Sequence, residues 1–463
     1  MQRRRIAAAV AIPVNQRLVQ RITMGATPGE LARVNAIGYD AYLEEQLDFE
    51  SLDDRLLERR VARDYPATSL TTAELLLQYK KNPFTVASDH LQIATMLRSI
   101  SSPRQLFERM VIFWSDHFNI DTDGDAIFLK PSDDRDVIRR HAMGTFPELL
   151  RASAYSPAML YYLDNYSNTK EFPQENYARE ILELHTLGVD KGYTQNDIVE
   201  VARCLTGWTF FDLSRRPKNR RGDFMFEGNY HDYDAKVVLG SRIPAGGGIS
   251  DGETVLEMLA EHPNTAEFIA RKLLRYFWGY EPKGSMVRKV KRAYLQTGGD
   301  IRAMLRVVLS RKLMRTATPK LKRPYHLIVS TVRAMEADVD PGKWLMWVPG
   351  ELRHGLFDWD TPDGYPDTFE YWSGSLLNRW NFAQGVIGDW NNGIDPDLPF
   401  LANPPASDAE LVDQIDQQFL AGGMSPETRN VILDYMSANP HTGDWRVRQV
   451  MNLVISSPEF QWY

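Results

Sequence analysis

The same signal for the start of a helix recurs along this chain: a capping residue followed three positions later by Glu or Gln. In this arrangement the two side chains satisfy backbone N–H groups of the first turn that have no partner within the helix. The pairs are Thr27 with Glu30, Thr71 with Glu74, Ser102 with Gln105, Thr145 with Glu148, Ser250 with Glu253, Asn264 with Glu267 and Ser407 with Glu410. After each start, apolar residues recur at helical rather than alternating spacing. The sequence therefore predicts a mainly α fold.

Two long stretches depart from this helical pattern. Residues 222–248 alternate in polarity and contain turn signals, which predicts a β-hairpin-like excursion. Residues 344–372 are dense in Trp, Pro, Gly and Asp, which predicts a long Trp-rich loop. Long ordered loops on a helical scaffold are where binding and catalytic residues concentrate.

We expect one large helical domain over residues 17–463, preceded by an N-terminal extension, residues 1–16, that is a candidate for disorder. Residues 240–250 are a soft internal boundary that could divide two helical halves. One continuous core fits the pattern equally well, because a chain of 463 residues is long enough for either arrangement.

Charge and cysteine content exclude several classes of protein. The net charge of -7 provides no overall positive field, and the basic runs Arg3–Arg5 and Arg215–Arg221 lie in loop-like segments, so we expect no nucleic-acid partner. The single cysteine, Cys204, excludes an intramolecular disulfide and cysteine-cluster zinc sites. No run approaches the roughly 20 apolar residues that span a bilayer, so we expect no transmembrane segment.

The first residues leave two alternatives for the compartment. A basic start precedes an apolar run, as in an export signal, but the run from Ile6 to Val14 is short and Pro13 interrupts it. We therefore expect a cytoplasmic protein, with a periplasmic or exported one as the alternative.

The stretch QENYAREILELHTLG concentrates charged side chains within one predicted helix. Helical geometry places His185 in the apolar arc, and Glu180 and Glu183 on the opposite side. Arg179 lies one turn from Glu183 and can pair with it. The glutamates form either a salt-bridged surface face or an inward polar face, at which Arg179 and Asn176 help to hold a ligand.

A second helix, SPRQLFERMVIFWSDHF, also carries a histidine in its apolar stripe. His117 lies beside Trp114 on that stripe, and Asp116 lies on the flank. A histidine in such a place is either a hydrogen-bonded core residue or a ligand. Together with His231 and Asp232 in the β excursion, the two core histidines favour the hypothesis that these elements converge on one site.

The Trp-rich loop has two interpretations. Its aromatic side chains could present flat faces to sugar rings, next to carboxylates that bind hydroxyl groups. Alternatively, the tryptophans clamp a long loop to the helical core.

Several strings, in this order along the chain, resemble a known family. They are RLVQRITMGATPGELARV, MVIFWSDHF, QENYAREILELHTLGVDKGYTQNDIVEVARCLTGW, HDYDAKVVLG, HPNTAEFIARKLLRYF, KRPYHLIVSTVRAM, PDGYPDTFEYWSGSLLNRWNF and SSPEF. The family is the bacterial one known as domain of unknown function 1800 (DUF1800), and the resemblance runs from about Arg17 to Phe460.

The resemblance implies a single long helical domain, but it implies no activity. It also implies frequent export, and a frequent neighbour from a second uncharacterised family with a sulfatase-like fold. Positions that match the family pattern are Trp114, His117, Asn176, Arg179, Glu180, Glu183, His185, Thr194, Arg203, Gly207, Trp208 and His231. Asp116 stands where the family more usually has Asn, and so adds a charge there.

The first functional hypothesis is an enzyme with a buried site lined by His and Glu. The candidate catalytic residues are Glu180, Glu183, Arg179 and His117, and the candidate ligand-binding residues are Asn176, Asp116, Trp114 and Asp232. In a metal-assisted version, a divalent metal ion is the cofactor, because His nitrogen and Glu oxygen atoms are common ligands of catalytic metals. Its candidate ligands are His117, Glu180, Glu183 and His231.

The second hypothesis is a non-enzymatic binding or assembly protein. In this hypothesis the polar helix faces fasten the helices together, and the Trp-rich loop recognises a glycan or a partner protein. A protein of the neighbouring sulfatase-like family is the candidate partner that the resemblance suggests.

Overall fold

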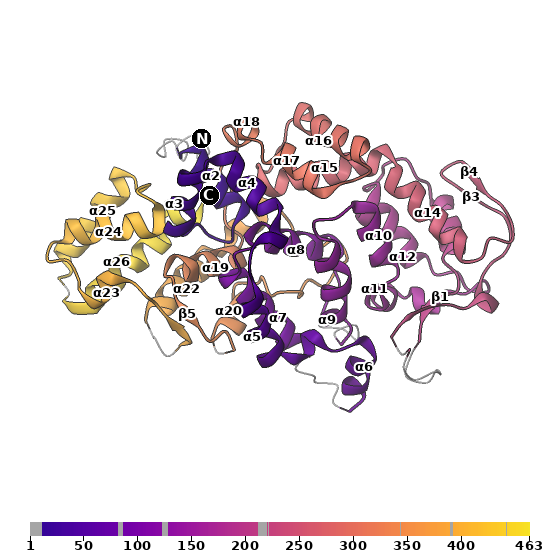
Figure 1. Cartoon of the computed structure of the whole chain (residues 1–463), viewed down its shortest axis with the longest axis horizontal. Coiled ribbons are helices and arrows are strands. Elements are labelled where there is room, and N and C mark those ends of the chain that lie inside the picture. Colours follow the sequence, from indigo (N-terminus) through magenta and orange to yellow (C-terminus); the bar gives the residue numbers. More distant parts are fainter. Residues whose placement is uncertain are drawn as a thin grey trace.

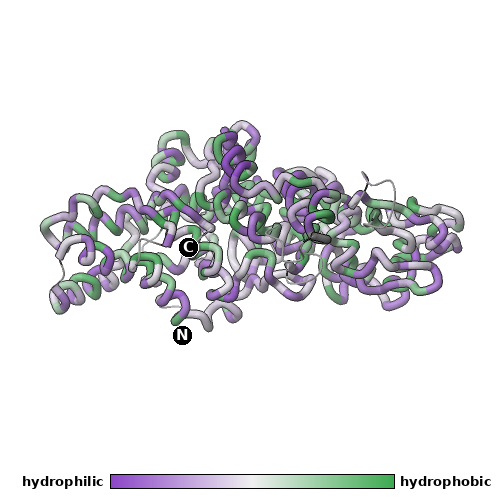
Figure 2. The backbone as a smooth tube through the Cα atoms, turned by 90° about the horizontal axis from the view of Figure 1, so that it is seen from below, coloured by the Kyte–Doolittle hydropathy of each residue, from purple (hydrophilic) through white to green (hydrophobic). Residues whose placement is uncertain are grey.

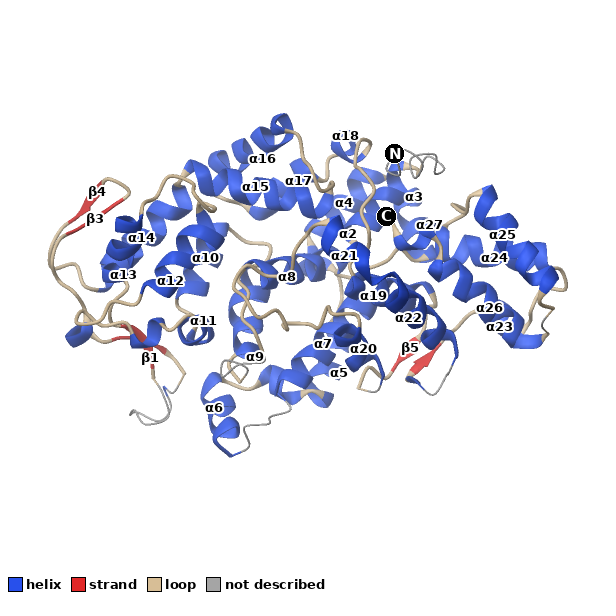
Figure 3. Ribbon diagram, turned by 180° about the vertical axis from the view of Figure 1, so that it is seen from behind, coloured by secondary structure: helices blue, strands red, loops and turns tan. Residues whose placement is uncertain are grey.

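The computed structural model describes residues 12–81, 87–122, 128–211, 220, 222–342, 344–388, 392–440 and 442–463. Helices dominate this part of the chain, and its strands form short antiparallel pairs (Figure 3). The mainly α fold predicted from the sequence is confirmed. The basic run Arg3–Arg5 and, apart from Arg220, the run Arg215–Arg221 lie outside the described residues, as do residues 1–11 of the predicted extension.

The elements of the first third of the chain are α2 (Val14–Ile22), α3 (Pro28–Ile37), α4 (Tyr39–Leu47), η2 (Phe49–Ser51), α5 (Arg55–Asp64), η3 (Pro66–Ser69), α6 (Thr72–Lys81), α7 (Ala87–Ser101), α8 (Gln105–His117), α9 (Lys130–Asp133) and η4 (Asp134–Arg139). The middle contains α10 (Phe146–Ala154), α11 (Pro157–Tyr162), η5 (Asn165–Ser167), α12 (Glu175–Glu180), η6 (Ile181–Thr186), α13 (Gln195–Cys204), β1 (Trp208–Phe210), β2 (Phe224–Phe226), η8 (Gly228–Tyr230), β3 (Lys236–Val238), β4 (Ser241–Ile243), α14 (Ile249–Glu261), α15 (Pro263–Phe277), α16 (Gly284–Thr297), α17 (Ile301–Val308) and α18 (Arg311–Met314). The last part contains α19 (Pro324–Ala334), β5 (Asp338–Val339), α20 (Trp344–Glu351), α21 (Phe369–Trp372), η9 (Ser373–Ser375), α22 (Leu376–Gly388), β6 (Ile394–Asp395), α23 (Pro399–Ala402), α24 (Asp408–Leu420), α25 (Pro426–Ala438), α26 (Gly443–Ser456) and α27 (Pro458–Gln461).

The helices form an elongated body (Figure 1). Helices α23–α26 lie at one end, and α14 with β1, β3 and β4 lies at the other, while α8 and α19 lie in between. The C-terminus lies beside α2, where a side chain of that helix, Arg21, donates a hydrogen bond to the main-chain oxygen of Tyr463. Segments from the two ends of the chain therefore meet in the middle of the molecule.

Two hydrophobic clusters make up most of the core. The larger one runs from Leu18 to Ala317 and takes side chains from α2, α4, α8 and α10–α17, including residues on both sides of 240–250. The smaller one takes side chains mainly from α7, α19, α20, α22, α24 and α26. Helix α19 is buried along its whole length, so its polar side chains face other parts of the protein rather than solvent.

Four of the predicted helix starts are confirmed. Thr27 and Thr71 each exchange hydrogen bonds with the glutamate three positions later. The hydroxyl groups of Thr145 and Ser407 accept hydrogen bonds from the backbone N–H groups of Glu148 and Glu410. Thr194 also begins a helix, α13, in the same way with Asp197, an acid that the search for Glu or Gln did not include.

Three predicted starts are wrong, because each of these helices begins at a residue other than the one after the predicted cap. Helix α8 begins at Gln105, whose side-chain amide donates to the carbonyls of Ser99 and Ser102. Ser250 lies inside α14 and donates to the carbonyl of Gly247. Helix α15 begins before Asn264, and the ring of the preceding histidine accepts the hydrogen bond of its backbone N–H.

The predicted β excursion is confirmed for β3 and β4, which pair antiparallel across a turn at Leu239 and Gly240. Strand β2 instead pairs with β1, which ends the preceding helical region. The sequence analysis missed this pairing, because β1 is a three-residue buried strand without an alternating pattern.

The predicted Trp-rich loop is in part helical. Its first residues form α20, and its last residues form α21. The segment between these helices is irregular, and the side-chain amide of Asn119 holds it by donating to the carbonyls of Trp359 and Thr361, at 2.7 and 2.9 Å. Gly364 allows a close approach to α8, because it has a φ of +70° and a Cβ there would collide with the carbonyl of Asp116.

None of the described helices combines the length and the apolar character that a bilayer-spanning segment needs. Hydrophobic and hydrophilic residues are intermixed along the described part of the chain, without a long hydrophobic stretch (Figure 2).

Candidate functional site

The charged string predicted as one helix consists of α12 followed by a π-helical turn, η6. In η6 the backbone N–H of Leu187 reaches the carbonyl of Leu182, five residues back, at 2.9 Å. His185 is fully buried, whereas Glu180 and Glu183 are partly exposed. The predicted separation of the histidine from the glutamates is therefore confirmed, although the helix changes its pitch between them. Such π-helical turns occur often at functional sites.

The polar side of α12 is a network of ion pairs. Arg179 contacts the carboxylates of Glu175 and Glu183, at 3.2 and 3.7 Å, and donates a hydrogen bond to Gln195 at 3.1 Å. Asn176 is exposed. Burial, followed by the neighbouring Glu183 carboxylate, raises the pKa of Glu180 above its usual value. This geometry fits the salt-bridged face, which was the first of the two predicted alternatives.

His117 is buried beside the other core histidine. Its Nε2 lies 3.1 Å from the carbonyl oxygen of His185, and its Nδ1 lies 2.9 Å from Nζ of Lys272. The carbonyl can only accept, so Nε2 donates to it and Nδ1 accepts from the lysine. Burial and the Lys272 cation both lower the pKa of His117 well below its usual value. Trp114 packs edge-on against this ring and donates from its indole nitrogen to the carbonyl of Ala142, so it is a core residue.

Two acidic residues, Asp116 on α8 and Asp367 in the Trp-rich loop, pair with basic side chains at the start of α19. Asp116 accepts a hydrogen bond from Arg323 at 2.6 Å, and Asp367 pairs with Lys320 at 2.8 Å and with Arg323 at 3.5 Å. Burial raises the pKa of Asp116 despite the arginine. Burial opposes ionisation of Asp367 as well, but Lys320 and Arg323 outweigh it and lower its pKa. We call Asp116, His117, Lys272, Lys320, Arg323 and Asp367 the central ion-pair cluster.

The β excursion holds its predicted site residues in a separate network. His231 is fully buried, with Nδ1 2.8 Å from the carbonyl of Thr206 and Nε2 3.2 Å from Asp251. The same carboxylate accepts a hydrogen bond from Lys236 at 2.8 Å. Asp232 pairs with Arg203 at 2.7 Å, and this arginine helps to lower its pKa, although burial acts in the opposite direction. These contacts fasten the excursion to α13 and α14.

The proposed metal ligands do not form a common site. Within the described ranges, no three His, Cys, Asp or Glu side chains come together in a way that could hold a metal ion. His117 faces a lysine and a carbonyl, His231 faces Asp251 and Thr206, and Glu183 faces Arg179.

A cavity of about 750 Å³ lies where α2, α19 and the C-terminal residues meet. This volume is typical of small-molecule sites, which span about 300–1,000 Å³. The residues that give it its chemistry are Arg17, Arg21, Lys322, His326, Ser330, Glu459, Phe460 and Tyr463. We call this space the basic cavity.

Three buried basic side chains at or beside the basic cavity have no Asp or Glu as a partner in the described part of the chain, although Arg109, Lys320 and Arg21 together outweigh burial and lower the pKa of the Tyr463 phenol. Among the described residues, no Asp or Glu forms an ion pair with Arg21, Arg109 or Lys322. Arg21 donates to main-chain oxygens of Phe277, Thr318 and Tyr463 instead, and its Nε makes no hydrogen bond to the described residues. Burial lowers its pKa to about 10.

Arg109 connects the basic cavity with the central ion-pair cluster. Its guanidinium lies over the ring of Tyr276, and its Nη1 lies 3.4 Å from Nδ1 of His326. Its Nε and Nη2 make no hydrogen bond to the described residues, although the side chain is buried. A small hollow contains residues of both: it is lined by Arg109 and His326 on the side of the basic cavity, and by Arg323 and Asp367 of the central ion-pair cluster. Burial and Arg109 lower the pKa of His326 well below its usual value.

The sequence analysis did not identify the residues of the basic cavity. A usable signal was present in the string KRPYHLIVS, where Lys322, His326 and Ser330 recur every four residues and so share one side of α19 and its entry. The other side of the cavity comes from α2 and the C-terminal segment, about which this spacing carries no information.

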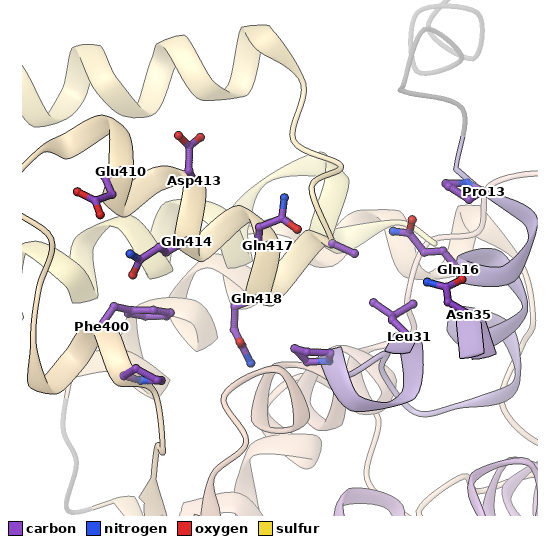
Figure 4. A pocket seen from close by; sticks show the side chains of 13 residues that line it. Pro13, Gln16, Leu31, Asn35, Phe400, Glu410, Asp413, Gln414, Gln417 and Gln418 are labelled. Atoms are coloured by element: carbon purple, nitrogen blue, oxygen red, sulfur yellow. The ribbon is translucent and has the colours of Figure 1, made fainter. Parts of the chain in front are cut away.

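A second, more open groove adjoins the basic cavity, and Gln16 lines both. Figure 4 shows this groove between the N-terminal helices, with Leu31 and Asn35, and the side chains of Gln414 and Gln417 on α24. Its lining is rich in amides and has no buried cation, so we do not assign it a reaction.

The irregular part of the Trp-rich loop has a hollow of its own, of about 380 Å³. It is lined by Gly350, Arg353, Asp358, Trp359, Asp360, Thr361, Tyr365 and Tyr371. Nearby, α20–α22 expose the large apolar side chains of Trp347, Leu376, Leu377 and Trp380.

The sequence model of a family described as "Protein of unknown function (DUF1800)" matches residues 17–462. The family predicted from the sequence motifs is thus confirmed over nearly the whole chain. No curated protein and no solved structure matches the chain.

Proposed function

We propose that this chain, which belongs to the DUF1800 family, is an enzyme that binds a small anionic substrate in the basic cavity. The observation that carries the proposal is the group of three buried basic side chains, Arg21, Arg109 and Lys322, that form no ion pair with Asp or Glu among the described residues. A buried charge is costly unless an opposite charge or hydrogen bonds compensate it. An anionic ligand would supply the missing charge.

The basic cavity also contains groups suited to proton transfer. Burial, followed by the Arg379 cation, lowers the pKa of Lys322 to about 7. Burial lowers the pKa of His326 well below its usual value, so its ring is neutral near pH 7 and can accept a hydrogen bond, whereas Lys322 can accept or donate a proton at that pH. General acid–base groups work best when their pKa lies near the operating pH. The enzyme hypothesis therefore moves from His117, Arg179 and the two glutamates to a different buried histidine, His326, with Lys322 and Arg21.

Anion binding can be tested with small ligands that contain no carbonyl group able to react with an amine. Acetate, glycolate, succinate and inorganic phosphate should be added at low ionic strength, and the unfolding temperature should be measured. We expect at least one of them to raise it, because a ligand that binds the folded state stabilises that state. The Lys322→Met variant should lose the effect, whereas Lys312→Met, which alters an exposed lysine, should retain it. If none of these anions shifts the wild-type unfolding temperature, anion binding in the basic cavity is refuted.

A second candidate function is carbohydrate binding at the hollow of the Trp-rich loop. Trp359, Tyr365 and Tyr371 supply aromatic faces there, and Asp358 and Asp360 supply carboxylates. Protein sites for sugars combine such groups, because sugars have apolar ring faces and polar rims. A partner protein of the sulfatase-like family stays a prediction of the resemblance.

Intrinsic fluorescence can test the carbohydrate candidate. Titration with soluble neutral oligosaccharides should change the tryptophan emission of the wild type, and Trp359→Ala should abolish the change. Trp380→Ala is the matched control, because Trp380 is 50% exposed but does not line the hollow. Loss of the response in both variants would point to the apolar surface rather than to the hollow.

A further inference from the structure

Lys320 and Lys322 form a matched pair of buried lysines two residues apart. Both lie on the segment that connects α18 to α19, and backbone hydrogen bonds to Gln461 and Tyr463 hold this segment in place. Lys320 has an acidic partner, since its Nζ lies 2.8 Å from both carboxylate oxygens of Asp367. The two lysines therefore share a backbone setting and differ in the charge around the amine.

Lys322 has a different kind of neighbourhood. Its Nζ donates one hydrogen bond to the hydroxyl of Ser330 at 3.0 Å and lies 3.7 Å from the centre of the Phe460 ring. Both of these residues line the basic cavity with it. Ser330 in turn donates to the carbonyl of Leu327 at 3.0 Å, the pattern of a serine within a helix. The serine proton is thus directed away from the lysine, which makes Ser330 a poor nucleophile and a suitable support for the amine.

The setting of Lys322 matches the conditions that activate a lysine amine. Removal from water next to another cation favours the neutral form, and the neutral amine is the nucleophile in enzymes that form Schiff bases. Arg379 is the neighbouring cation that acts in this direction. Burial lowers the pKa of Lys320 as well, but the ion pair with Asp367 acts in the opposite direction and favours the charged, unreactive form of this lysine.

We propose that Lys322 is a covalent nucleophile, which forms an imine with a small carbonyl compound that carries an anionic group. This inference rests on the proposed function, because the cations of the basic cavity are what would select the anionic group. Ser330 acts as a positioning residue that orients the amine toward the open part of the cavity.

The reaction is balanced without an oxidant or a reductant. The lone pair of Nζ adds to the carbonyl carbon, the π electrons move to the carbonyl oxygen, and one proton passes from nitrogen to oxygen. The resulting carbinolamine then loses its hydroxyl group and the second nitrogen proton as water, which leaves a C=N bond. Arg21, which lines the basic cavity and is held by the carbonyl of Phe277, would face the anionic group, and Arg109 would add positive charge from beside the cavity.

Reductive trapping tests this inference on the full chain. The protein should be incubated near pH 7.5 with sodium cyanoborohydride and either glyoxylate, an anionic aldehyde, or glycolaldehyde, a neutral one of similar size. Peptide mass spectrometry then compares labelling of Lys322 and Lys320 within the same molecules.

We expect glyoxylate to label Lys322 at least about tenfold faster than Lys320. This ratio corresponds to a difference of one pKa unit, which sets the fraction of each amine that is neutral. The Lys322→Met variant confirms the assignment, and Ser330→Ala should slow labelling of Lys322 without changing that of Lys320.

The possible results separate the inference from the proposed function. If glyoxylate labels Lys322 no faster than Lys320, the imine proposal is overturned, and the shift of the unfolding temperature by acetate or phosphate still tests anion binding by itself. If both aldehydes label Lys322 equally fast, the amine is reactive but the basic cavity does not select an anion, which overturns the proposed function. The comparison within one wild-type chain needs no variant to fold.

Discussion

Lys272 donates a hydrogen bond from Nζ to Nδ1 of His117 across 2.9 Å, so a cation rather than a carboxylate is the side-chain partner of this buried histidine. Burial, followed by the effect of Arg323, lowers the pKa of Lys272 to about 8, although Asp116 acts in the opposite direction. His117 is thereby held neutral with both ring nitrogens occupied, which explains why it does not serve as a free ligand.

Replacement of Lys272 should raise the pKa of His117. In Lys272→Met the cation that disfavours the imidazolium is gone, but burial, the larger cause of the shift, remains. We therefore expect a pKa that moves upward and stays below the ordinary value of about 6.5. NMR titration of the histidine ring signals measures it, with Lys289→Met, an exposed substitution on α16, as the control. An unchanged His117 pKa would contradict the contact.

Replacement by leucine should affect the stability of the protein differently at two fully buried histidines, His185 and His231. Both ring nitrogens of His185 make no hydrogen bond to the described residues, whereas those of His231 contact Thr206 and Asp251. A buried polar group without a partner costs about 1–3 kcal/mol. We expect His185→Leu to keep or raise the free energy of unfolding at pH 7, and His231→Leu to lower it by about 2 kcal/mol. Urea denaturation compares the two variants.

The stability of the wild type should fall as the pH drops below about 6.5. Burial lowers the pKa of His185 to about 3 in the folded protein, so the unfolded chain binds a proton between these pH values that the folded one does not. The contribution of His185 to the free energy of unfolding is complete above the pKa of a histidine in the unfolded chain. As the pH falls below that value, this contribution is lost at about 1.4 kcal/mol per pH unit. His185→Leu should reduce the slope of unfolding free energy against pH by this amount between pH 6 and 5. An identical slope in wild type and variant would be inconsistent with a neutral His185.

Arg323 should contribute far more to stability than an exposed arginine in a similar ion pair. Arg323→Met leaves Asp116 without its partner, and because the pair is partly buried we expect a cost of about 2–4 kcal/mol, somewhat below that of a fully buried pair. Arg306, which pairs with Glu44 at 2.8 Å on the surface, is the matched control, and its replacement by Met should cost less than about 1 kcal/mol. Chemical denaturation measures the free energy of unfolding of both variants. Equal losses would contradict a stabilising role of the central ion-pair cluster.

Gly364→Ala should destabilise the Trp-rich loop more than Gly240→Ala destabilises the β3–β4 turn. Both glycines have a positive φ, +70° and +75°, which costs a non-glycine residue about 1–2 kcal/mol. A Cβ at Gly364 would also collide with the carbonyl of Asp116, whereas a Cβ at Gly240 meets nothing within 4 Å. We expect a larger loss of unfolding free energy for Gly364→Ala, with a change in tryptophan fluorescence. Equal losses of unfolding free energy would show that the Trp-rich loop moves away from Asp116 without a measurable loss of stability.

Local patterns predicted local structure well. The capping pair of Thr27 and Glu30 begins α3, and the helical position of His185 predicts its burial, because both depend on residues within one or two turns. At the wrong start of α15, the ring of His262 rather than Asn264 caps the backbone of the first turn. The motifs also identified the family.

Local sequence patterns were sufficient to predict the helical class, the β3–β4 hairpin and the burial of His117 and His185. Which polar residues meet depends on the tertiary structure: the predicted His and Glu residues pair with separate neighbours, and Lys322 shares a cavity with Arg21 and Tyr463. Arg21 and Tyr463 are 442 positions apart, yet they are joined by a hydrogen bond of 2.9 Å. Periodicity and capping act over a few residues, whereas burial of charge depends on every segment that packs around it, so the site could be located only after the chain was folded.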